Sequence, residues 1–187
     1  MTLQKILITG ELVLHERAAE VQEINGNVCQ LVADMFETMD AAPGVGLAAT
    51  QIGVGLRIFV FSYSFEDQEI RGVAINPTLA LSALSDEELD EDADAEGCLS
   101  IPGERFPLKR ADNVTLTATD LEGVEFQIEA QGWLARIFQH EFDHLEGILF
   151  ADRLVKPHKR LMKKAIKENG WGKVGSSWLP GKDYLEP

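Results

Sequence analysis

The sequence predicts an α+β fold in which antiparallel strands pack around a central helix that carries the motif HExxH. Segments with apolar residues at helical spacing alternate irregularly with short β-prone segments, some of which follow one another across turn sequences. A parallel sheet would instead require regular alternation of strand and helix. Because the 187 residues contain no internal repeat and no low-complexity linker, we expect a single domain spanning 1–187.

Three helices are expected. The first covers 25–39, where Val28, Val32 and the apolar residues that follow them fall on one face of the helix. The second covers 133–145 and is strongly apolar apart from interspersed charged and imidazole side chains. The third covers 157–169, because a proline stands at its start and a glycine follows its end.

Strands are expected where short apolar segments are rich in β-branched and aromatic residues. This pattern occurs at 56–63 and more briefly at 73–75. The segments 114–119 and 124–130 flank the turn sequence Asp-Leu-Glu-Gly, and 114–119 alternates apolar residues with threonine. We therefore predict a β-hairpin there.

The composition excludes several classes of protein. With 17 Lys and Arg against 31 Asp and Glu, the net charge is −14 and the pI is near 4.6, which argues against a DNA-binding protein. Two cysteines, Cys29 and Cys98, are too few for a disulfide-stabilised secreted scaffold. No segment has the length of a membrane span or the pattern of a signal peptide, so we expect a cytoplasmic protein without a membrane partner.

The charge is unevenly distributed along the chain. The segment 86–96 contains eight acidic residues and no basic one, and we expect a solvated, mobile loop there. It lacks the alternating ligands of a calcium loop, so a cation site is discounted. Six basic residues and no acidic one fall between 156 and 167, on the third predicted helix. Their simplest interpretation is a solvated face that complements the helix dipole.

The HExxH motif on the second predicted helix indicates a metal site. His140 and His144 are four residues apart and therefore lie on one face of the helix. Glu141 is adjacent to His140 and within reach of a metal-bound water. The simpler alternatives are a chance match or a patch of exposed histidines.

A catalytic metal site needs a third protein ligand. The third histidine that metzincins carry is absent after His144, although a more distant glutamate remains possible. The better candidate is Cys98, because a thiolate binds iron or zinc strongly and the adjacent Gly97 allows close backbone approach. Cys29, on the first predicted helix, is interpreted as a buried and inert thiol.

Three segments, taken together, resemble the peptide deformylase family. They are GVGLAATQ at 44–51, EGCLS at 96–100 and QHEFDHLEG at 139–147, which match the family patterns GxGLAAxQ, EGCLS and QHExDHLxG in the same order. The resemblance extends over about 5–155. The basic helix at about 157–169 follows this core, and the tail 171–187 has no assignment.

The resemblance implies a metal-dependent hydrolase that removes the formyl group from N-formyl-methionyl nascent peptides and releases formate. Cys98, His140 and His144 would bind one Fe²⁺, which Zn²⁺, Ni²⁺ or Co²⁺ can replace. Glu141 would act as general base and then general acid. The side-chain amide of Gln51 and the backbone N–H of Leu99 would stabilise the tetrahedral oxyanion.

The resemblance also implies a substrate cleft. Val45, Trp133 and Ile137, with the ring edge of His140, would form the methionine pocket, although each apolar member could equally be ordinary core. Gly44 and Gly46 would allow the backbone to pair with an extended peptide, and Arg105 would lie near the cleft. Asp143 points off the ligand face, so we expect it to form a structural ion pair with Arg110.

Two other functions remain open from the sequence. One is a zinc endopeptidase that uses the same HExxH motif, and the other is a non-catalytic homologue that binds nascent chains. Since the C-terminal helix of the family can dock on the ribosome, the basic segment 157–169 could also contact ribosomal RNA phosphates.

Overall fold

The computed structural model describes residues 2–42, 44–65, 68–84, 88–183 and 185, and these residues adopt the predicted α+β fold. The strands are β1 (Ile6–Leu7), β2 (Gly46–Ala48), β3 (Ile58–Phe65), β4 (Gln68–Leu81), β5 (Ala95–Cys98), β6 (Ile101–Pro107), β7 (Asn113–Thr119), β8 (Glu125–Gln131) and β9 (Ser177–Trp178). The helices are α1 (Gly26–Ala41), α2 (Gly132–Leu145), α3 (Phe150–Arg153) and α4 (His158–Glu168), with two 3₁₀ turns, η1 (Leu12–His15) and η2 (Ala49–Ile52).

The strands form three antiparallel sheets. A five-stranded sheet has the order β2-β3-β4-β7-β8, and β5-β6 and β1-β9 form two-stranded sheets. The predicted hairpin is confirmed as β7 and β8. The strand predicted at 73–75 is wrong in extent, because β4 continues through Asn76 and Pro77. A register shift between Ile75 and Thr78 removes Pro77 from the hydrogen-bonded ladder and so tolerates its missing N–H.

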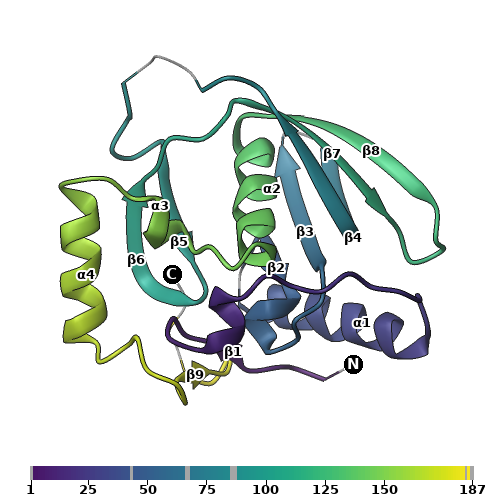
Figure 1. The fold of residues 1–187 in the computed structure, drawn as a ribbon, viewed down its shortest axis with the longest axis horizontal. Helices are drawn as coiled ribbons and strands as arrows, with labels where there is room; N and C mark the ends of the chain where they lie inside the picture. Colours follow the sequence, from purple (N-terminus) through teal and green to yellow (C-terminus); the bar gives the residue numbers. More distant parts are fainter. Residues whose placement is uncertain (1, 43, 66–67, 85–87, 184, 186–187) are drawn as a thin grey trace.

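Helix α2 occupies the centre of the molecule, between the five-stranded sheet and the β5–β6 hairpin (Figure 1). One side of α2 packs on the sheet, where the Phe138 ring lies 5.0 Å from the ring of Phe61 and 6.1 Å from that of Phe59. This apolar contact fixes the rotation of the helix about its axis. The side chains on its other side are thereby directed toward β5.

Helix α1 confirms the predicted apolar face but corrects one expectation. Asn25 caps the helix, since its side chain accepts hydrogen bonds from the N–H groups of Asn27 and Val28. Val28 and Val32 are buried in the core, whereas Cys29 is exposed. The interpretation of Cys29 as a buried thiol is therefore wrong, because the next residue along a helix is rotated by about 100° from its neighbour.

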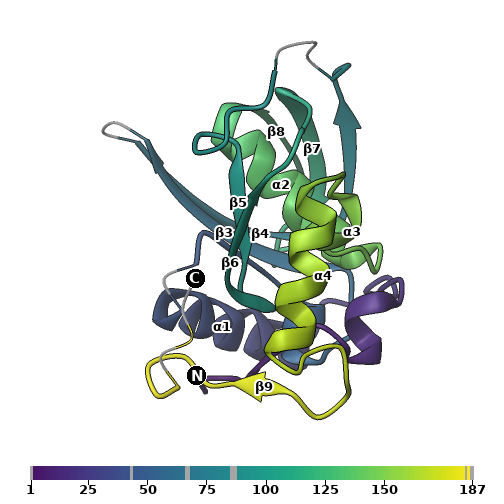
Figure 2. The ribbon, with the colours of Figure 1, turned by 90° about the vertical axis from the view of Figure 1, so that its left-hand side faces the viewer.

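The C-terminal part of the chain packs against the β5–β6 side of the molecule. Helix α4 runs along β6, and the chain then turns back to β9 (Figure 2). Only Met162 of α4 is fully buried, and it joins a cluster with Leu14, Ile101 and Phe150. The tail, which had no assignment from sequence, pairs through β9 with β1. No helix in the described ranges is long and apolar enough to cross a membrane.

Candidate metal centre and active site

The three predicted metal ligands converge at the buried side of α2. His140 and His144 project from α2, and Cys98 is the last residue of β5. Their ligand atoms all lie within 4.8 Å of one another, and Cys98 Sγ is 3.3 Å from His144 Nε2. In a tetrahedral site with metal–sulfur bonds of about 2.3 Å and metal–nitrogen bonds of about 2.1 Å, adjacent ligand atoms are roughly 3.5 Å apart. The geometry therefore fits one divalent ion.

The surroundings of these ligands also fit a metal. Burial lowers the pKa of His144 well below its usual value, so the ring is neutral and able to act as a ligand. Glu141 Oε2 is buried and has no hydrogen-bond partner among the described residues. Such an unpaired buried oxygen costs stability unless something else bonds to it, such as a water molecule on a bound ion.

Glu141 has the properties of a proton-transfer group. It is 4% exposed, and burial raises the pKa of its carboxyl to about 7. A group that accepts and returns a proton works best when its pKa is close to the working pH. Gly46 of β2 provides the space for it, because a Cβ atom there would lie 2.7 Å from Glu141 Cδ. The glycine is thus required by the close approach of β2 to α2.

Gln51 and Leu99 lie on either side of the Cys98 ligand. Gln51 Oε1 accepts a hydrogen bond from Ala48 N at 2.8 Å, which directs Nε2 toward Cys98 Sγ at 3.8 Å and Ser100 Oγ at 3.3 Å. Leu99 follows Cys98 directly and forms, with Ser100, the turn of the β5–β6 hairpin. Two residues predicted to stabilise an oxyanion are therefore adjacent to the same ligand.

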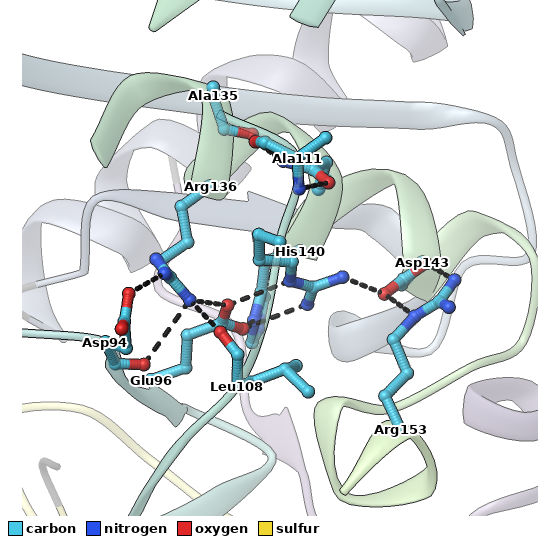
Figure 3. A network of polar contacts seen from close by, with 11 residues as sticks. Asp94, Glu96, Leu108, Ala111, Ala135, Arg136, His140, Asp143 and Arg153 are labelled. Carbon is cyan, nitrogen blue, oxygen red and sulfur yellow. Dashed lines mark hydrogen bonds and ion pairs between the residues drawn. The ribbon is translucent and has the colours of Figure 1, made fainter. Parts of the chain in front are cut away.

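Glu96, which the sequence analysis assigned to a solvated acidic loop, is 3% exposed and lies at the centre of an ion-pair network (Figure 3). Its carboxylate accepts two hydrogen bonds from Arg110, at 2.8 and 2.9 Å, and one from Arg136 at 2.9 Å. Its Oε2 is also 3.0 Å from His140 Nδ1. The expectation of a solvated loop is wrong for Glu96, because this residue lies in β5 and its side chain is buried. Residues 86 and 87 of the acidic segment lie outside the described residues.

The Glu96 carboxylate holds the ring of His140, a candidate metal ligand. Although burial alone would raise its pKa, hydrogen bonds from Arg110 and His140 hold the pKa of Glu96 well below the usual value. In the tautomer protonated at Nδ1, His140 donates a hydrogen bond to the charged carboxylate, and its Nε2 lone pair is available to a metal ion. Strand alternation could have identified this residue, since Glu96 and Cys98 are two positions apart and both are buried.

The network continues to the far side of α2. Asp143 accepts a hydrogen bond from Arg110 at 2.6 Å, which confirms the predicted ion pair, and it also pairs with Arg153. Asp94 pairs with Arg136, so the chain of charges extends from the β5 strand to α3 (Figure 3). These contacts attach α2, which carries two of the candidate metal ligands, to the β5 segment and to α3.

A cavity of about 270 Å³ opens beside Cys98 and His140, two of the three candidate ligands. All six residues that the sequence analysis placed at the substrate cleft contribute to its lining: Gly44, Val45, Gly46, Arg105, Trp133 and Ile137. Gln51, Cys98, Leu99, His140 and Glu141 also line it. Arg136, which was not predicted, forms a further part of the wall, with its guanidinium 5.5 Å from the Trp133 ring centroid.

Known proteins resemble this chain over most of its length. The sequence model of the family described as polypeptide deformylase matches residues 3–160. The chain is 49% identical to the peptide deformylase of Tropheryma whipplei, covering 94% of this chain and 92% of the relative. It is 48% identical to peptide deformylase 2 of Corynebacterium efficiens, covering 98% and 96% of the two chains.

Solved structures agree with these sequence relatives. The peptide deformylase of Legionella pneumophila superposes with a TM-score of 0.78 at 36% identity, covering 90% of this chain and 96% of the other. The peptide deformylase of Ehrlichia chaffeensis, solved in complex with actinonin, superposes with a TM-score of 0.78 at 35% sequence identity. This match covers 90% of this chain and 98% of the other. The chain belongs to the peptide deformylase family.

As a peptide deformylase, the chain is a hydrolase that removes the N-formyl group from newly synthesised polypeptides. The resemblance inferred from the three sequence motifs is confirmed. A zinc endopeptidase and a non-catalytic homologue are not favoured by these relatives. The metal-centre candidate made by Cys98, His140 and His144 is the one expected of a metalloenzyme in this family.

Proposed function

We propose that Cys98, His140 and His144 hold one Fe²⁺ and that the adjoining cavity binds the formyl-methionyl end of a nascent polypeptide. The observation that carries this proposal is that the three ligand atoms converge beside a cavity whose lining includes Cys98, His140, Glu141 and Gln51. Zn²⁺, Ni²⁺ or Co²⁺ can occupy the same ligands. When bound, the ion supplies a water molecule whose pKa is lowered toward neutrality.

Glu141 moves the proton in this reaction. It accepts a proton as the water oxygen adds to the formyl carbon, and it then donates that proton to the departing amine nitrogen. The C–N bond breaks, the polypeptide leaves with a free amino terminus, and formate is released. A buried carboxyl with a pKa of about 7 is suited to both steps.

Gln51 and Leu99 stabilise the charge that develops on the formyl oxygen. The Gln51 Nε2 group is fixed in direction by the bond between its Oε1 and Ala48 N, so little reorganisation is needed when the oxyanion forms. The Leu99 backbone N–H supplies the second donor. Both donors adjoin Cys98, and so both adjoin the ion that this residue binds.

The cavity walls position the peptide. β2 is an edge strand of the five-stranded sheet, and its first residue, Gly46, lines the cavity together with Gly44 and Val45, which precede the strand. An extended peptide can therefore pair with this edge. Trp133 and Ile137 offer an apolar surface for the methionine side chain. Arg105 is exposed at the cavity and is placed to contact residues that follow methionine.

Formate release from a formyl-Met peptide tests the proposal. Glu141→Gln should lower kcat by at least about a hundredfold while the ion stays bound. Glu88→Gln, at an exposed position, is the matched control and should leave kcat unchanged. Wild-type protein that carries Fe²⁺ or Ni²⁺ and releases no formate would show the proposal to be wrong.

The identity of the ion requires its own test. Metal analysis of protein purified without air should find iron. Because oxidation of ferrous iron or of the Cys98 thiolate should destroy activity, nickel-loaded protein should outlast iron-loaded protein in air. Equal rates of decay would contradict a weakness specific to iron, and metal analysis that finds no iron would contradict a ferrous centre.

We also propose that α4 contacts ribosomal RNA in the cytoplasm, where nascent chains are made. Its basic residues are exposed, and α4 itself is anchored by the buried Met162. Replacing Lys163 and Lys167 by Glu should weaken ribosome binding and flatten its salt dependence. The same charge change at Lys173 and Lys182, in the tail, is the control. If the variant at Lys163 and Lys167 binds ribosomes as tightly as the wild type, α4 makes no such contact.

A further inference from the structure

Trp178 connects the C-terminal tail to the active site. It lies in β9, beyond the segment 3–160 that the family model matches, and its side chain is 1% exposed. Its indole Nε1 donates a hydrogen bond of 2.8 Å to the backbone carbonyl of Leu99. The tail thereby bonds the residue whose N–H is the proposed oxyanion donor.

The turn that contains Leu99 is held from both ends of the chain. The Leu99 carbonyl accepts from Trp178, and the next carbonyl, that of Ser100, accepts from Thr9 N at 2.9 Å. These two anchors support each other, because β1 and β9 pair directly, with Ile6 opposite Trp178. The turn is therefore hydrogen-bonded to both terminal segments of the chain.

The same turn also determines the position of the second proposed donor. Gln51 Nε2 is 3.3 Å from Ser100 Oγ, so a shift of the turn would displace the partner of this amide as well. On the opposite side, Cys98 is a proposed metal ligand and pairs with Ile101 in the hairpin. Cys98 fixes the chain before Leu99, and the bond from Trp178 fixes the carbonyl that follows the Leu99 Cα. The Leu99 N–H lies between these two points and therefore has little freedom to change direction.

We propose that Trp178 is a positioning residue for the oxyanion site, which it orients through the Leu99 carbonyl. This inference rests on the proposed role of Leu99 as a donor. A buried indole N–H needs some acceptor, but the acceptor here belongs to a residue that adjoins both the ligand Cys98 and the cavity. The tail thus contributes to the rate of the reaction without touching the substrate.

Trp178→Phe removes the indole donor and keeps an aromatic ring in the core. We expect kcat for formate release to fall by about tenfold, less than the roughly 10²–10³ lost when an oxyanion donor is removed outright. KM should stay within about twofold, because the donor acts on charge that develops in the transition state. Trp171→Phe is the matched control, since Trp171 lies in the same tail and packs against the core, and it should change neither constant.

A second measurement does not depend on turnover. In Zn²⁺-loaded protein, whose ion is diamagnetic, NMR should show the Thr9 amide, which donates to the Ser100 carbonyl of this turn, exchanging with solvent about ten times faster in Trp178→Phe than in wild type, because the turn opens more often. If Phe at this position unfolds the protein, the indole can be replaced by benzothiophene, in which sulfur takes the place of the N–H and the ring shape is kept.

The two measurements separate the possible failures. A wild-type enzyme that releases no formate would overturn the proposed function, whereas unchanged exchange of the Thr9 amide in the variant would overturn the role of Trp178 by itself. Equal losses of kcat in Trp178→Phe and Trp171→Phe would also overturn it, since general loosening of the tail would then be the cause. Faster exchange together with a selective fall in kcat would support it.

Discussion

Replacing Glu96 by Gln tests whether the buried ion-pair network supports the metal centre. The substitution keeps the volume of the side chain and one carbonyl acceptor but removes the negative charge. Arg110 and Arg136 then lose the carboxylate that they share, although Arg110 keeps Asp143 and Arg136 keeps Asp94. The His140 ring loses the acceptor that holds its Nδ1 proton.

The magnitude follows from the burial of both partners. The side chains of Glu96 and Arg110 are 4% and 5% exposed, so solvent cannot replace the lost contact. Removing one member of a buried pair costs about 3–5 kcal/mol in the free energy of unfolding, and the remaining amide carbonyl places the expected loss near 3 kcal/mol. Loss of a partner that orients a ligating histidine should weaken metal binding by about 10–100-fold.

Acid should diminish the difference between the two proteins. The pKa of Glu96 is lower in the folded than in the unfolded chain, so its contribution is complete above the usual glutamate pKa of 4.5 and declines as the pH falls below that value. The gap in unfolding free energy between wild type and Glu96→Gln should therefore be constant from neutrality to about pH 5 and narrow in more acidic solution.

Urea unfolding of the zinc-loaded proteins and chelator competition measure the two effects. Glu88→Gln, an exposed member of the same acidic segment, should stay within about 0.5 kcal/mol of wild type and bind the metal equally well. If Glu96→Gln matches Glu88→Gln in both measurements, Glu96 neither stabilises the fold nor orients His140, and the interpretation of the network is refuted.

Three further changes test the site. Gly46→Ala should lower kcat by about tenfold to a hundredfold, because the new Cβ displaces Glu141, whereas Gly26→Ala, where a Cβ meets no atom, should not change kcat. Steady-state kinetics measure both, and equal kcat values would contradict the steric argument. Gln51→Leu should lower kcat by about 10²–10³ with the ion retained, and an unchanged kcat would exclude its amide as a donor. Removing the ion should lower the free energy of unfolding by about 2.7 kcal/mol relative to protein with metal at a hundred times its Kd, whereas an unchanged midpoint on calorimetry would contradict a site at Cys98.

The longer elements could be predicted because their patterns are local. Helices α1, α2 and α4 and the β7–β8 hairpin extend over enough residues for periodicity and turn chemistry to mark them. Strands β1, β2, β5 and β9 contain only two to four residues each. Such segments have no readable period, and they become strands only because distant parts of the chain supply their hydrogen-bond partners.

The candidate metal ligands could be named for a different reason. His140 and His144 are related by one helical turn, and Cys98 is the better candidate for a third ligand on chemical grounds, so none of the three needs tertiary information to be named. Glu96 required such information, because a count of charges in 86–96 treats all its members alike. The partners that distinguish Glu96, Arg110 and Arg136, come from other segments of the chain.

Helix α2 shows why the stability of the fold and the assembly of the site are linked. One face packs on the sheet through Phe138, while His140, Glu141, Asp143 and His144 bring four titratable groups into the interior. Burial of such groups is costly unless each has a partner. The network provides partners for His140 and Asp143, whereas Glu141 Oε2 and His144 Nδ1 have none among the described residues. Of these two atoms, Glu141 Oε2 is the one that faces the proposed metal and its water, because His144 directs Nε2 rather than Nδ1 toward Cys98 Sγ. Metal binding should thus stabilise the fold most strongly at this helix.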